Sequence, residues 1–149
     1  MKIIKNIKQA SRFLKIKDDE ILYFRKYSNG DWLYIDKNKY CHLYRDINDQ
    51  WIELTKDVKA LFVVSLPNTD WIYKDKEGYE HLFREINGKQ IELTRNVKTK
   101  CTYSHINGSW NYQDKNGDWH LFDKNNKLII PMRIQCENNY GIHSTKIIN

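Results

Sequence analysis

Short runs in which apolar and polar side chains alternate fill most of the chain, and turn residues separate them. The first clear run is WLYID at residues 32–36, and the runs CHLYRDI, QWIELT and ALFVVSL follow it. Alternation with a period of two residues is typical of β-strands. The intervening segments DKNK, ND and TKDVK have the composition of hairpin turns and loops. The pattern predicts an all-β chain made of four-stranded antiparallel meanders.

The pattern recurs along the chain with a period of 39 residues. Tryptophan lies at positions 32, 71 and 110, and four other residue types recur with the same spacing. They are Tyr34, Tyr73 and Tyr112; Asp36, Asp75 and Asp114; His42, His81 and His120; and Leu43, Leu82 and Leu121. Three copies at a fixed period of this length indicate a repeat architecture. We therefore expect residues 1–149 to form a single repeat domain.

The first copy begins in the middle of a unit, because FLKIKDDEILYFRKYSNGDW before Trp32 aligns with IELTKDVKALFVVSLPNTDW. Counting from about Arg12 gives three units at about 12–46, 50–85 and 89–123, each ordered as third, fourth, first and second strand. Residues 128–149 are then predicted to be closing strands. We favour closure with pseudo-threefold symmetry, as in a β-trefoil, with a small β-propeller as the alternative. An open stack of hairpins ranks last because it leaves long sheet edges unprotected.

The segments WIYKDKEG and WNYQDKNG carry a family resemblance. They resemble the short β repeats called WG or KWG repeats, which occur mostly in bacterial proteins. The residue after the tryptophan is Leu33, Ile72 or Asn111 in this chain, where that family has glycine. The resemblance implies a binding or scaffold role, and it transfers no active site.

Residues 1–11 are predicted to form an amphipathic helix. Ile3, Ile7, Ala10 and Leu14 fall on one side of a helical wheel. The other side gathers the basic residues Lys2, Lys5, Lys8, Arg12 and Lys15. Such a helix docks on a membrane, a nucleic acid or a partner groove, or it lays its apolar stripe on the β body as a cap. We favour the cap, because it would also shield an open edge.

The net charge of +6 is concentrated at the N-terminus. Residues 1–26 contain eight basic and three acidic residues, a net charge of +5, whereas residues 27–149 contain seventeen and sixteen, a net charge of +1. Electrostatic steering of a partner should therefore come from the N-terminal segment. Nucleic-acid binding through the basic helix stays open, but a basic face on the repeats is not expected.

The repeated tryptophan and histidine residues have two interpretations. In the favoured one they form a structural hydrogen-bond cluster in each copy with aspartate and Thr55 or Thr94, since buried polar groups are normally paired. In the other, His42, His81 and His120 meet at a symmetry axis and bind zinc. We expect neither a metal nor a cofactor. The sequence has no GxSxG, HExxH or Walker motif, so we do not expect an enzyme.

The hairpin tips carry aromatic residues that are candidates for recognition. Tyr40 and Tyr79 follow equivalent turns, and Trp119 lies one residue later in the third copy. Turns often carry function while strands form the scaffold. These rings are suited to stack on sugars or bases, to anchor a protein interface, or simply to pack over neighbouring hairpins.

Together these features predict a non-catalytic interaction protein whose partner is a macromolecule, foremost a protein. Its small size and the many Lys, Asn and Ile residues of an AT-rich genome fit a phage-type or mobile-element inhibitor of a bacterial enzyme complex. The alternatives are a lectin-like carbohydrate-binding module and a nucleic-acid-binding protein. Three cysteines without metal-ligand spacing, and no apolar run of membrane-spanning length, predict a cytoplasmic location. The oligomeric state, monomer or homodimer, stays open.

Overall fold

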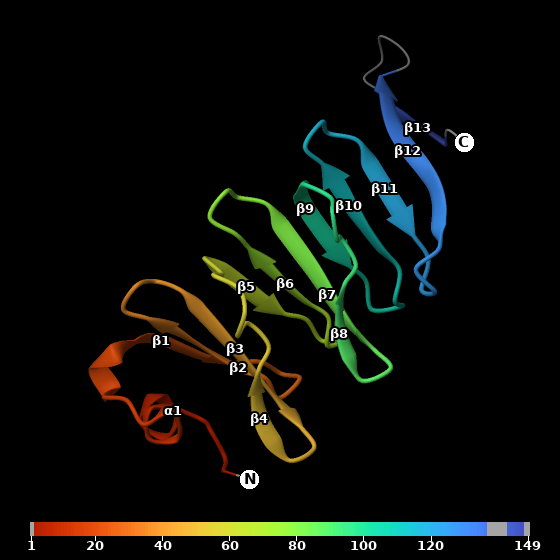
Figure 1. Cartoon of the computed structure of the whole chain (residues 1–149). Helices are drawn as coiled ribbons and strands as arrows, with labels where there is room; N and C mark the ends of the chain where they lie inside the picture. Colours follow the sequence, from red (N-terminus) through yellow and green to blue (C-terminus); the bar gives the residue numbers. More distant parts are fainter. Residues whose placement is uncertain (1, 137–142, 148–149) are drawn as a thin grey trace. The chain divides into compact units, whose positions relative to one another are not determined.

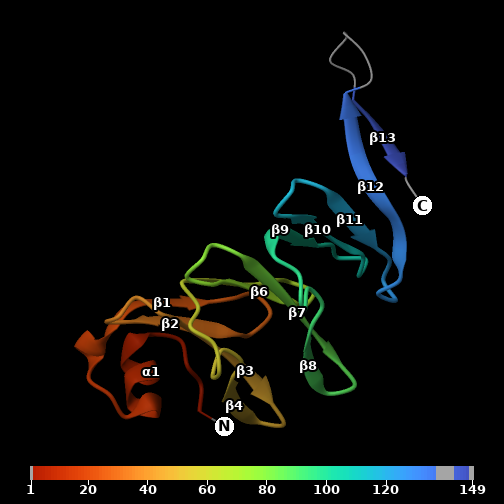
Figure 2. The same ribbon diagram turned by 45° about the horizontal axis from the view of Figure 1, so that its top comes forward.

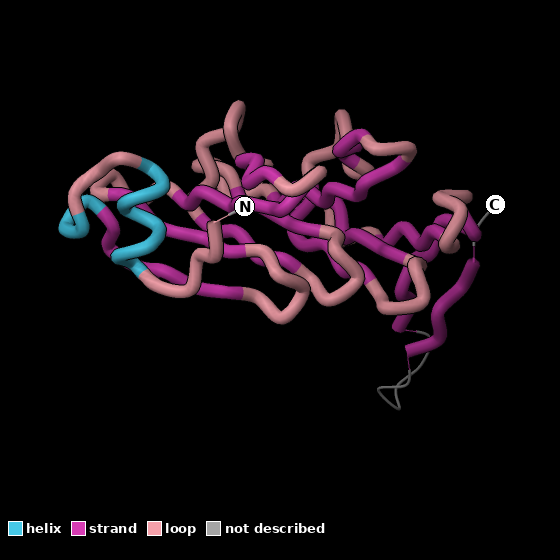
Figure 3. The backbone as a smooth tube through the Cα atoms, turned by 90° about the horizontal axis from the view of Figure 1, so that it is seen from below, coloured by secondary structure: helices cyan, strands magenta, loops and turns pink. Residues whose placement is uncertain are grey.

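The protein, seen here as a computed structural model that describes residues 2–136 and 143–147, consists of antiparallel β-strands with one short N-terminal helix (Figure 1). Its contacts divide it into two compact units, Met1–Glu77 and Gly78–Asn149. Helical segments occur only near the N-terminus of the described chain, as Figure 3 shows. The prediction of a mainly β chain with an N-terminal helix is confirmed.

The first unit begins with helix α1 (Ile7–Leu14) and a 3-10 turn η1 (Asp18–Glu20). Its strands are β1 (Ile21–Lys26), β2 (Trp32–Asp36), β3 (Cys41–Ile47), β4 (Gln50–Glu53), β5 (Phe62–Ser65) and β6 (Trp71–Lys74). Strands β1 to β4 form a sheet in chain order, and β5 pairs with β6 as a hairpin. Every one of these pairings is antiparallel.

The second unit contains strands β7 to β13. They are β7 (Glu80–Ile86), β8 (Lys89–Glu92), β9 (Thr99–Ser104), β10 (Trp110–Asp114), β11 (Trp119–Phe122), β12 (Leu128–Cys136) and β13 (His143–Ile147). Strand β7 pairs with both β8 and β9, and β9 to β13 follow one another in chain order. The predicted closing segment 128–149 thus contains β12 and β13, and the remainder of that segment lies outside the described residues.

The 39-residue repeat is visible in the strands themselves. Strands β2, β6 and β10 begin at residues 32, 71 and 110, and β3, β7 and β11 begin at 41, 80 and 119. Strands β4 and β8 begin at 50 and 89. Three similar copies of the repeat, with similar aromatic and charged residues, are therefore present, as the sequence predicts.

Neither unit closes into a barrel through the strand pairings of its described residues. The trefoil-like closure that we favoured is therefore not observed within a unit, and neither is the propeller alternative. Within each unit the strands pair in the open manner that we ranked last. The predicted meander places β5 beside β4, whereas β5 is observed to pair with β6. The loop after β4 explains this difference.

The TKDVK loop, residues 55–59, leads the chain back to β3. The backbone N–H of Leu43 donates to Thr55 Oγ1 (3.0 Å), and the backbone N–H of Cys41 donates to Ala60 O (2.9 Å). One side of β3 is therefore shared between β4, Thr55 and Ala60. As a result β5 starts beside β3 and forms its hairpin with β6.

Helix α1 begins later than predicted, at Ile7 rather than within residues 1–6. The Asn6 side chain accepts a hydrogen bond from Gln9 N (2.9 Å), which makes it an N-cap. The helix ends where Lys15 adopts a left-handed conformation (φ 59°). Residues 13–16, which align with the strand segment IELT of the next copy, thus form the helix end and the residues that follow it. The loop segment KDVK of that copy aligns with residues 17–20, which contain the 3-10 turn.

Helix α1 packs on one face of the first sheet (Figure 2), as the favoured cap interpretation predicts. Buried Ala10 shares an apolar cluster with Trp32 and Tyr34 of β2. Ile4 is buried in the same cluster, whereas Ile3 is 63% exposed. The predicted stripe is therefore wrong at Ile3, because residues 2–5 precede the helix and do not follow its periodicity. In the part of the chain that the structure describes, no helix has the length and apolar character needed to span a membrane.

Candidate functional site

Aromatic rings stack across strands β2 and β3 in the first unit. Trp32 lies opposite Tyr44 with ring centroids 4.4 Å apart and planes 4° apart. The next pair on this face is Tyr34 and His42, at 4.5 Å and 13°. Offset or near-parallel ring pairs at such distances stabilise a sheet beyond the area that they bury. These repeated rings therefore hold two strands together.

The second unit repeats this arrangement on β10 and β11. Trp110 stacks on Phe122 at 4.0 Å and 5°, and Tyr112 stacks on His120 at 4.7 Å and 18°. The register of the two strands pairs the same four residues directly. Because the arrangement recurs with its geometry intact, the ring ladder is a property of the repeat rather than of one site.

His42 is held between two carboxylates. Its Nε2 lies 2.7 Å from Asp36 Oδ2, and its Nδ1 lies 2.8 Å from Glu53 Oε2. Thr55 Oγ1 donates to Glu53 Oε2 (2.9 Å) and accepts from the backbone N–H of Leu43 (3.0 Å). This chain of hydrogen bonds connects β2, β3, β4 and the following loop, so its geometry is that of a structural cluster.

The other copies keep parts of the cluster. His81 Nδ1 lies 2.8 Å from Glu92 Oε2, which also accepts from Thr94 Oγ1 (3.1 Å). His120 Nε2 lies 2.9 Å from Asp114 Oδ2. Each histidine is thus engaged by a carboxylate 6 or 11 residues away in the sequence. Among the described residues, no group of three or more side chains is arranged to ligate a metal, and the zinc interpretation gains no support.

Trp32 and Trp110 do not belong to this hydrogen-bond cluster, in contrast to our prediction. Within the described chain the buried Nε1 of Trp32 has no hydrogen-bond partner. In the second unit, Trp110 Nε1 donates to Asn126 Oδ1 (2.9 Å) rather than to a member of the histidine cluster. The indoles act through stacking and burial instead.

The carboxylates around His42 shift its pKa and theirs in opposite directions. Burial alone would lower the pKa of His42, but the hydrogen bonds to Glu53 and Asp36 outweigh it and raise this pKa above the ordinary 6.5. Burial would raise the pKa of Glu53 and of Asp36, yet the hydrogen bonds with His42 hold both below their ordinary values of 4.5 and 3.8. The charged form of each group is therefore favoured by folding.

We expect the cluster to stabilise the fold most between about pH 4.5 and 6.5. A raised histidine pKa gives stability that is complete below 6.5 and is lost as the pH rises through the folded-state value. The lowered carboxylate pKa values give stability that is lost at acid pH. Thermal melts at about pH 6 and pH 8.5 should show a loss on the order of 1 kcal/mol in the native chain. His42→Gln should show a smaller loss, and an equal pH dependence of the two proteins would contradict this account.

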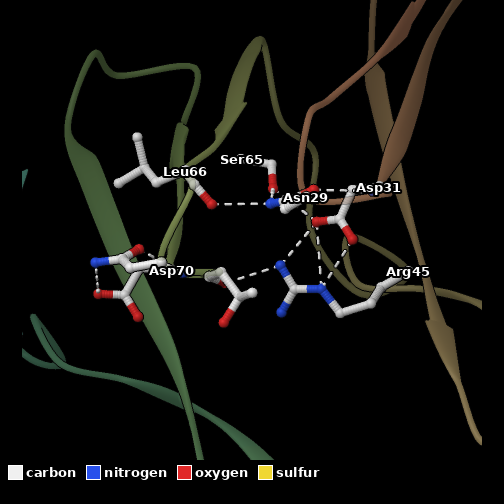
Figure 4. A network of polar contacts seen from close by, with 8 residues as sticks. Asn29, Asp31, Arg45, Ser65, Leu66 and Asp70 are labelled. Atoms are coloured by element: carbon white, nitrogen blue, oxygen red, sulfur yellow. Dashed lines mark hydrogen bonds and ion pairs between the residues drawn. The ribbon is translucent and has the colours of Figure 1, made fainter. Parts of the chain in front are cut away.

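A second polar network centres on the buried ion pair of Asp31 and Arg45 (Figure 4). Arg45 donates from Nη2 to Asp31 Oδ2 (2.7 Å) and to the backbone oxygen of Thr69 (2.7 Å). Ser65 Oγ donates to Asp31 Oδ2 (2.6 Å), and Asn29 Nδ2 donates to Ser65 Oγ (2.6 Å). The network connects the β1–β2 turn, β3, β5 and the β5–β6 turn. These hydrogen bonds connect separate segments of the first unit, so we assign the network a structural role.

The five predicted basic residues are all exposed, but they do not form one helix face. Lys8 and Arg12 lie in α1, and Lys15 caps its C-terminal end. Lys2 and Lys5 lie in the segment before the helix. Only Lys5 and Lys8 line a common cavity, whereas Lys2 lines two others on the side of Trp51.

This common cavity is a groove of about 640 Å³ between α1 and β1. We call it the α1–β1 groove; it is lined by Lys5, Asn6, Ile7, Lys8, Asp18, Leu22, Tyr23 and Phe24. Two large apolar residues of β1 stand open to solvent in it, with Leu22 54% and Tyr23 48% exposed. The groove thus combines exposed cationic groups with uncovered apolar surface.

A β-bulge explains why two consecutive residues of β1 are exposed. The register with β2 shifts between Ile21 and Tyr23. A bulge inserts one extra residue into a strand and breaks the strict alternation of its side chains. Leu22 and Tyr23 are therefore both uncovered, while Ile21 before them is buried.

The predicted tip residues are only half-buried, and each has a neighbour within its own unit. The Nζ of Lys59 lies 5.8 Å from the ring centroid of Tyr40, and the Nζ of Lys98 lies 5.7 Å from that of Tyr79. Trp119 packs near Tyr103 with centroids 5.9 Å apart. These contacts favour a packing role over an open platform for ligands.

Comparison with other proteins does not indicate what this surface binds. No protein-family model and no curated protein matches this chain. The resemblance to WG or KWG repeats stays a prediction. The function is therefore inferred from the structure of the chain itself. In this structure the α1–β1 groove is the strongest candidate for a binding site.

Sequence reasoning missed several of these residues. Glu53 and Glu92 were visible as a pair 39 residues apart, and their common spacing from the histidines could have identified them as partners. Arg45 and Arg84 recur in the same way. Leu22 and Tyr23 had no such signal, because a bulge is not encoded in the alternation pattern.

Proposed function

We propose that the chain is a non-catalytic interaction protein that binds a protein partner through the α1–β1 groove. The observation that carries this proposal is the exposure of Leu22 and Tyr23 beside Lys5 and Lys8. Uncovered aromatic and aliphatic side chains with a charged rim are typical of protein interfaces. The histidine clusters and the Asp31–Arg45 network, by contrast, make hydrogen bonds within the fold.

The charges of the groove favour an acidic partner. Within the described chain no ion pair engages the side chain of Lys5 or Lys8. The single acidic residue that lines the groove, Asp18, accepts a hydrogen bond from the Ser11 hydroxyl. The two lysines therefore remain available to carboxylates of another molecule, and they would also raise the rate of encounter.

Reversing the charge of the groove should weaken partner binding by at least about tenfold, because two favourable contacts become repulsive. The variant is Lys5→Glu with Lys8→Glu, and the matched control is Lys56→Glu with Lys76→Glu, which makes the same charge change at exposed sites outside the groove. Proteins that co-purify with the native chain from its host are identified by mass spectrometry, and their affinities are then measured. The free energy of unfolding of both variants should lie within about 0.5 kcal/mol of that of the native chain.

Equal binding by the groove variant and the control would show that the groove is not the interface.

Nucleic-acid binding through the same lysines is the second candidate, carried by the net charge of +5 in residues 1–26. It predicts an affinity for DNA or RNA that falls steeply as salt rises, since each phosphate contact releases counterions. An affinity for the partner that changes little with salt favours a protein partner over a nucleic acid. The lectin-like role, and action as a phage-type or mobile-element inhibitor of a bacterial enzyme complex, stay predictions.

A further inference from the structure

Strand β1 lies at the end of its sheet. The order in the first sheet is β1, β2, β3, β4, so β1 has a strand neighbour on one side only within this sheet. An edge strand of this kind presents unpaired backbone N–H and C=O groups to another chain. Natural edges are usually blunted by charges, bulges or covering segments. Here the bulge lies at the start of β1, and the residues after it are regular.

The β1–β2 turn defines which backbone groups point outward. Tyr27 N donates to Asp31 O (2.8 Å), and Gly30, at φ 98°, donates back to Tyr27 O (3.1 Å). Hydrogen-bonded and non-hydrogen-bonded pairs alternate along an antiparallel ladder. Arg25 is thus the next residue bonded to β2, while the N–H and C=O of Phe24 and Lys26 are directed away from it.

The surroundings of this edge are mainly basic and apolar, and Asp18 is the acidic residue that lines the adjoining groove. Arg25 and Lys26 are exposed on β1 itself, and Lys5 and Lys8 line the adjoining groove. Leu22 and Tyr23 of β1 contribute the most exposed apolar surface of the groove. A segment that lies along β1 would therefore meet positive charge from several directions and apolar surface at one end.

We propose that the α1–β1 groove receives an extended acidic segment of the partner protein, which pairs with the free edge of β1 as an added strand. This inference rests on the proposed function and specifies its partner. Main-chain hydrogen bonds to Phe24 and Lys26 supply affinity, and alternate side chains supply specificity. Carboxylates of the segment face the lysines, and an apolar side chain covers Leu22 and Tyr23.

The charge of this surface favours an acidic segment over a second copy of the chain as the occupant. Pairing of β1 with β1 of another copy would bring together two N-terminal segments that each carry a net charge of +5. Like charges in an interface cost several kcal/mol, so self-pairing is disfavoured. An acidic segment meets the same surface with opposite charge.

The test combines peptide selection with a proline variant. Random twelve-residue peptides displayed on phage are selected on the full chain, and the enriched peptides are synthesised for calorimetry. We expect them to be acidic, with β-branched or aromatic residues at alternate positions.

Lys26→Pro removes an outward N–H and should weaken binding at least tenfold, since proline cannot donate to an added strand. Lys26→Ala is the control for loss of the side chain, including its contact with Ile4 O (3.4 Å), and should bind within about threefold of the native chain.

Amide hydrogen exchange provides a readout on the native chain that does not depend on how Lys26→Pro folds. Binding of the selected peptide should protect the amides of Phe24 and Lys26, whereas the amide of Arg25 is already bonded to β2. If those two amides are not protected, or if the enriched peptides are neutral or basic, the inference is wrong. Normal binding by Lys26→Pro together with lost binding by Lys5→Glu/Lys8→Glu would overturn the added strand but leave the proposed function standing. Unchanged binding in both variants would overturn both.

Discussion

Replacing Trp32 with alanine is expected to lower the free energy of unfolding by about 3–5 kcal/mol. Trp32 is fully buried and is the centre of the aromatic cluster in the first unit. Tyr44 stacks on it at 4.4 Å, and Phe13 of α1 meets its ring edge-on with centroids 6.0 Å apart. Truncation leaves a cavity beneath the helix and removes the ring that connects α1 to the sheet. Urea denaturation of the variant measures the loss.

Two further variants show whether ring stacking is the cause. Trp32→Phe keeps an aromatic ring and removes the indole N–H, which has no hydrogen-bond partner in the described chain, so it should cost clearly less than Trp32→Ala. Ile106→Ala at an exposed turn (87% exposed) should change stability by no more than about 0.5 kcal/mol. Equal losses for Trp32→Phe and Trp32→Ala would contradict the role assigned to the stack.

Asp31→Asn should cost about 3–5 kcal/mol, because it leaves Arg45 as a buried cation without its counter-charge. Asp31 is 2% exposed and Arg45 is 8% exposed. The amide has nearly the same shape as the carboxylate, so the change removes charge without creating a cavity. The comparison is made by urea denaturation, and an unchanged m-value ensures that the same surface unfolds.

A double-mutant cycle isolates the ion pair. Arg45→Met alone should also destabilise strongly, since Asp31 then becomes an unpaired buried anion. The double variant Asp31→Asn/Arg45→Met should cost much less than the sum of the two single changes, because neither charge is left alone. Strict additivity would show that the two residues do not depend on each other, and the network of Figure 4 would then not explain their burial.

Much of the fold follows from local patterns in the sequence. The 39-residue spacing of Trp32, Trp71 and Trp110 correctly predicts three similar copies, and the alternation within WLYID and CHLYRDI predicts β2 and β3. The amphipathic pattern predicts a capping helix. These features depend on interactions between residues that are close in sequence, so they are readable from one chain.

The parts that were not predicted depend on longer-range contacts. Residues 13–16 resemble a strand segment of the next copy, but Phe13 and Leu14 pack against the aromatic cluster of β2 and β3, and this tertiary contact favours a helix. Closure was predicted from symmetry, whereas the hydrogen bond from Cys41 to Ala60 directs the chain into a new hairpin. Such contacts override local propensity and leave no periodic signal.

The candidate site was predicted only in part. Lys5 and Lys8 were recognised from charge, but Leu22 and Tyr23 were not, because their exposure results from the bulge in β1. The tip residues Tyr40 and Tyr79 were predicted as recognition elements, and the structure adds that each has a lysine over its ring. Side-chain partners of this kind become visible only when the fold brings separate segments together.

Site-specific photo-crosslinking tests the central claim most directly, namely that a protein partner binds in the α1–β1 groove. A photoreactive phenylalanine analogue replaces Tyr23 in the groove, and in a second protein it replaces Ile106, which is more exposed but lies far along the chain. In cells of the native host, irradiation should link position 23 to one defined protein and give no such product from position 106. The product should disappear when Lys5→Glu and Lys8→Glu are added. A partner that is linked from position 106 but not from position 23 would contradict the account.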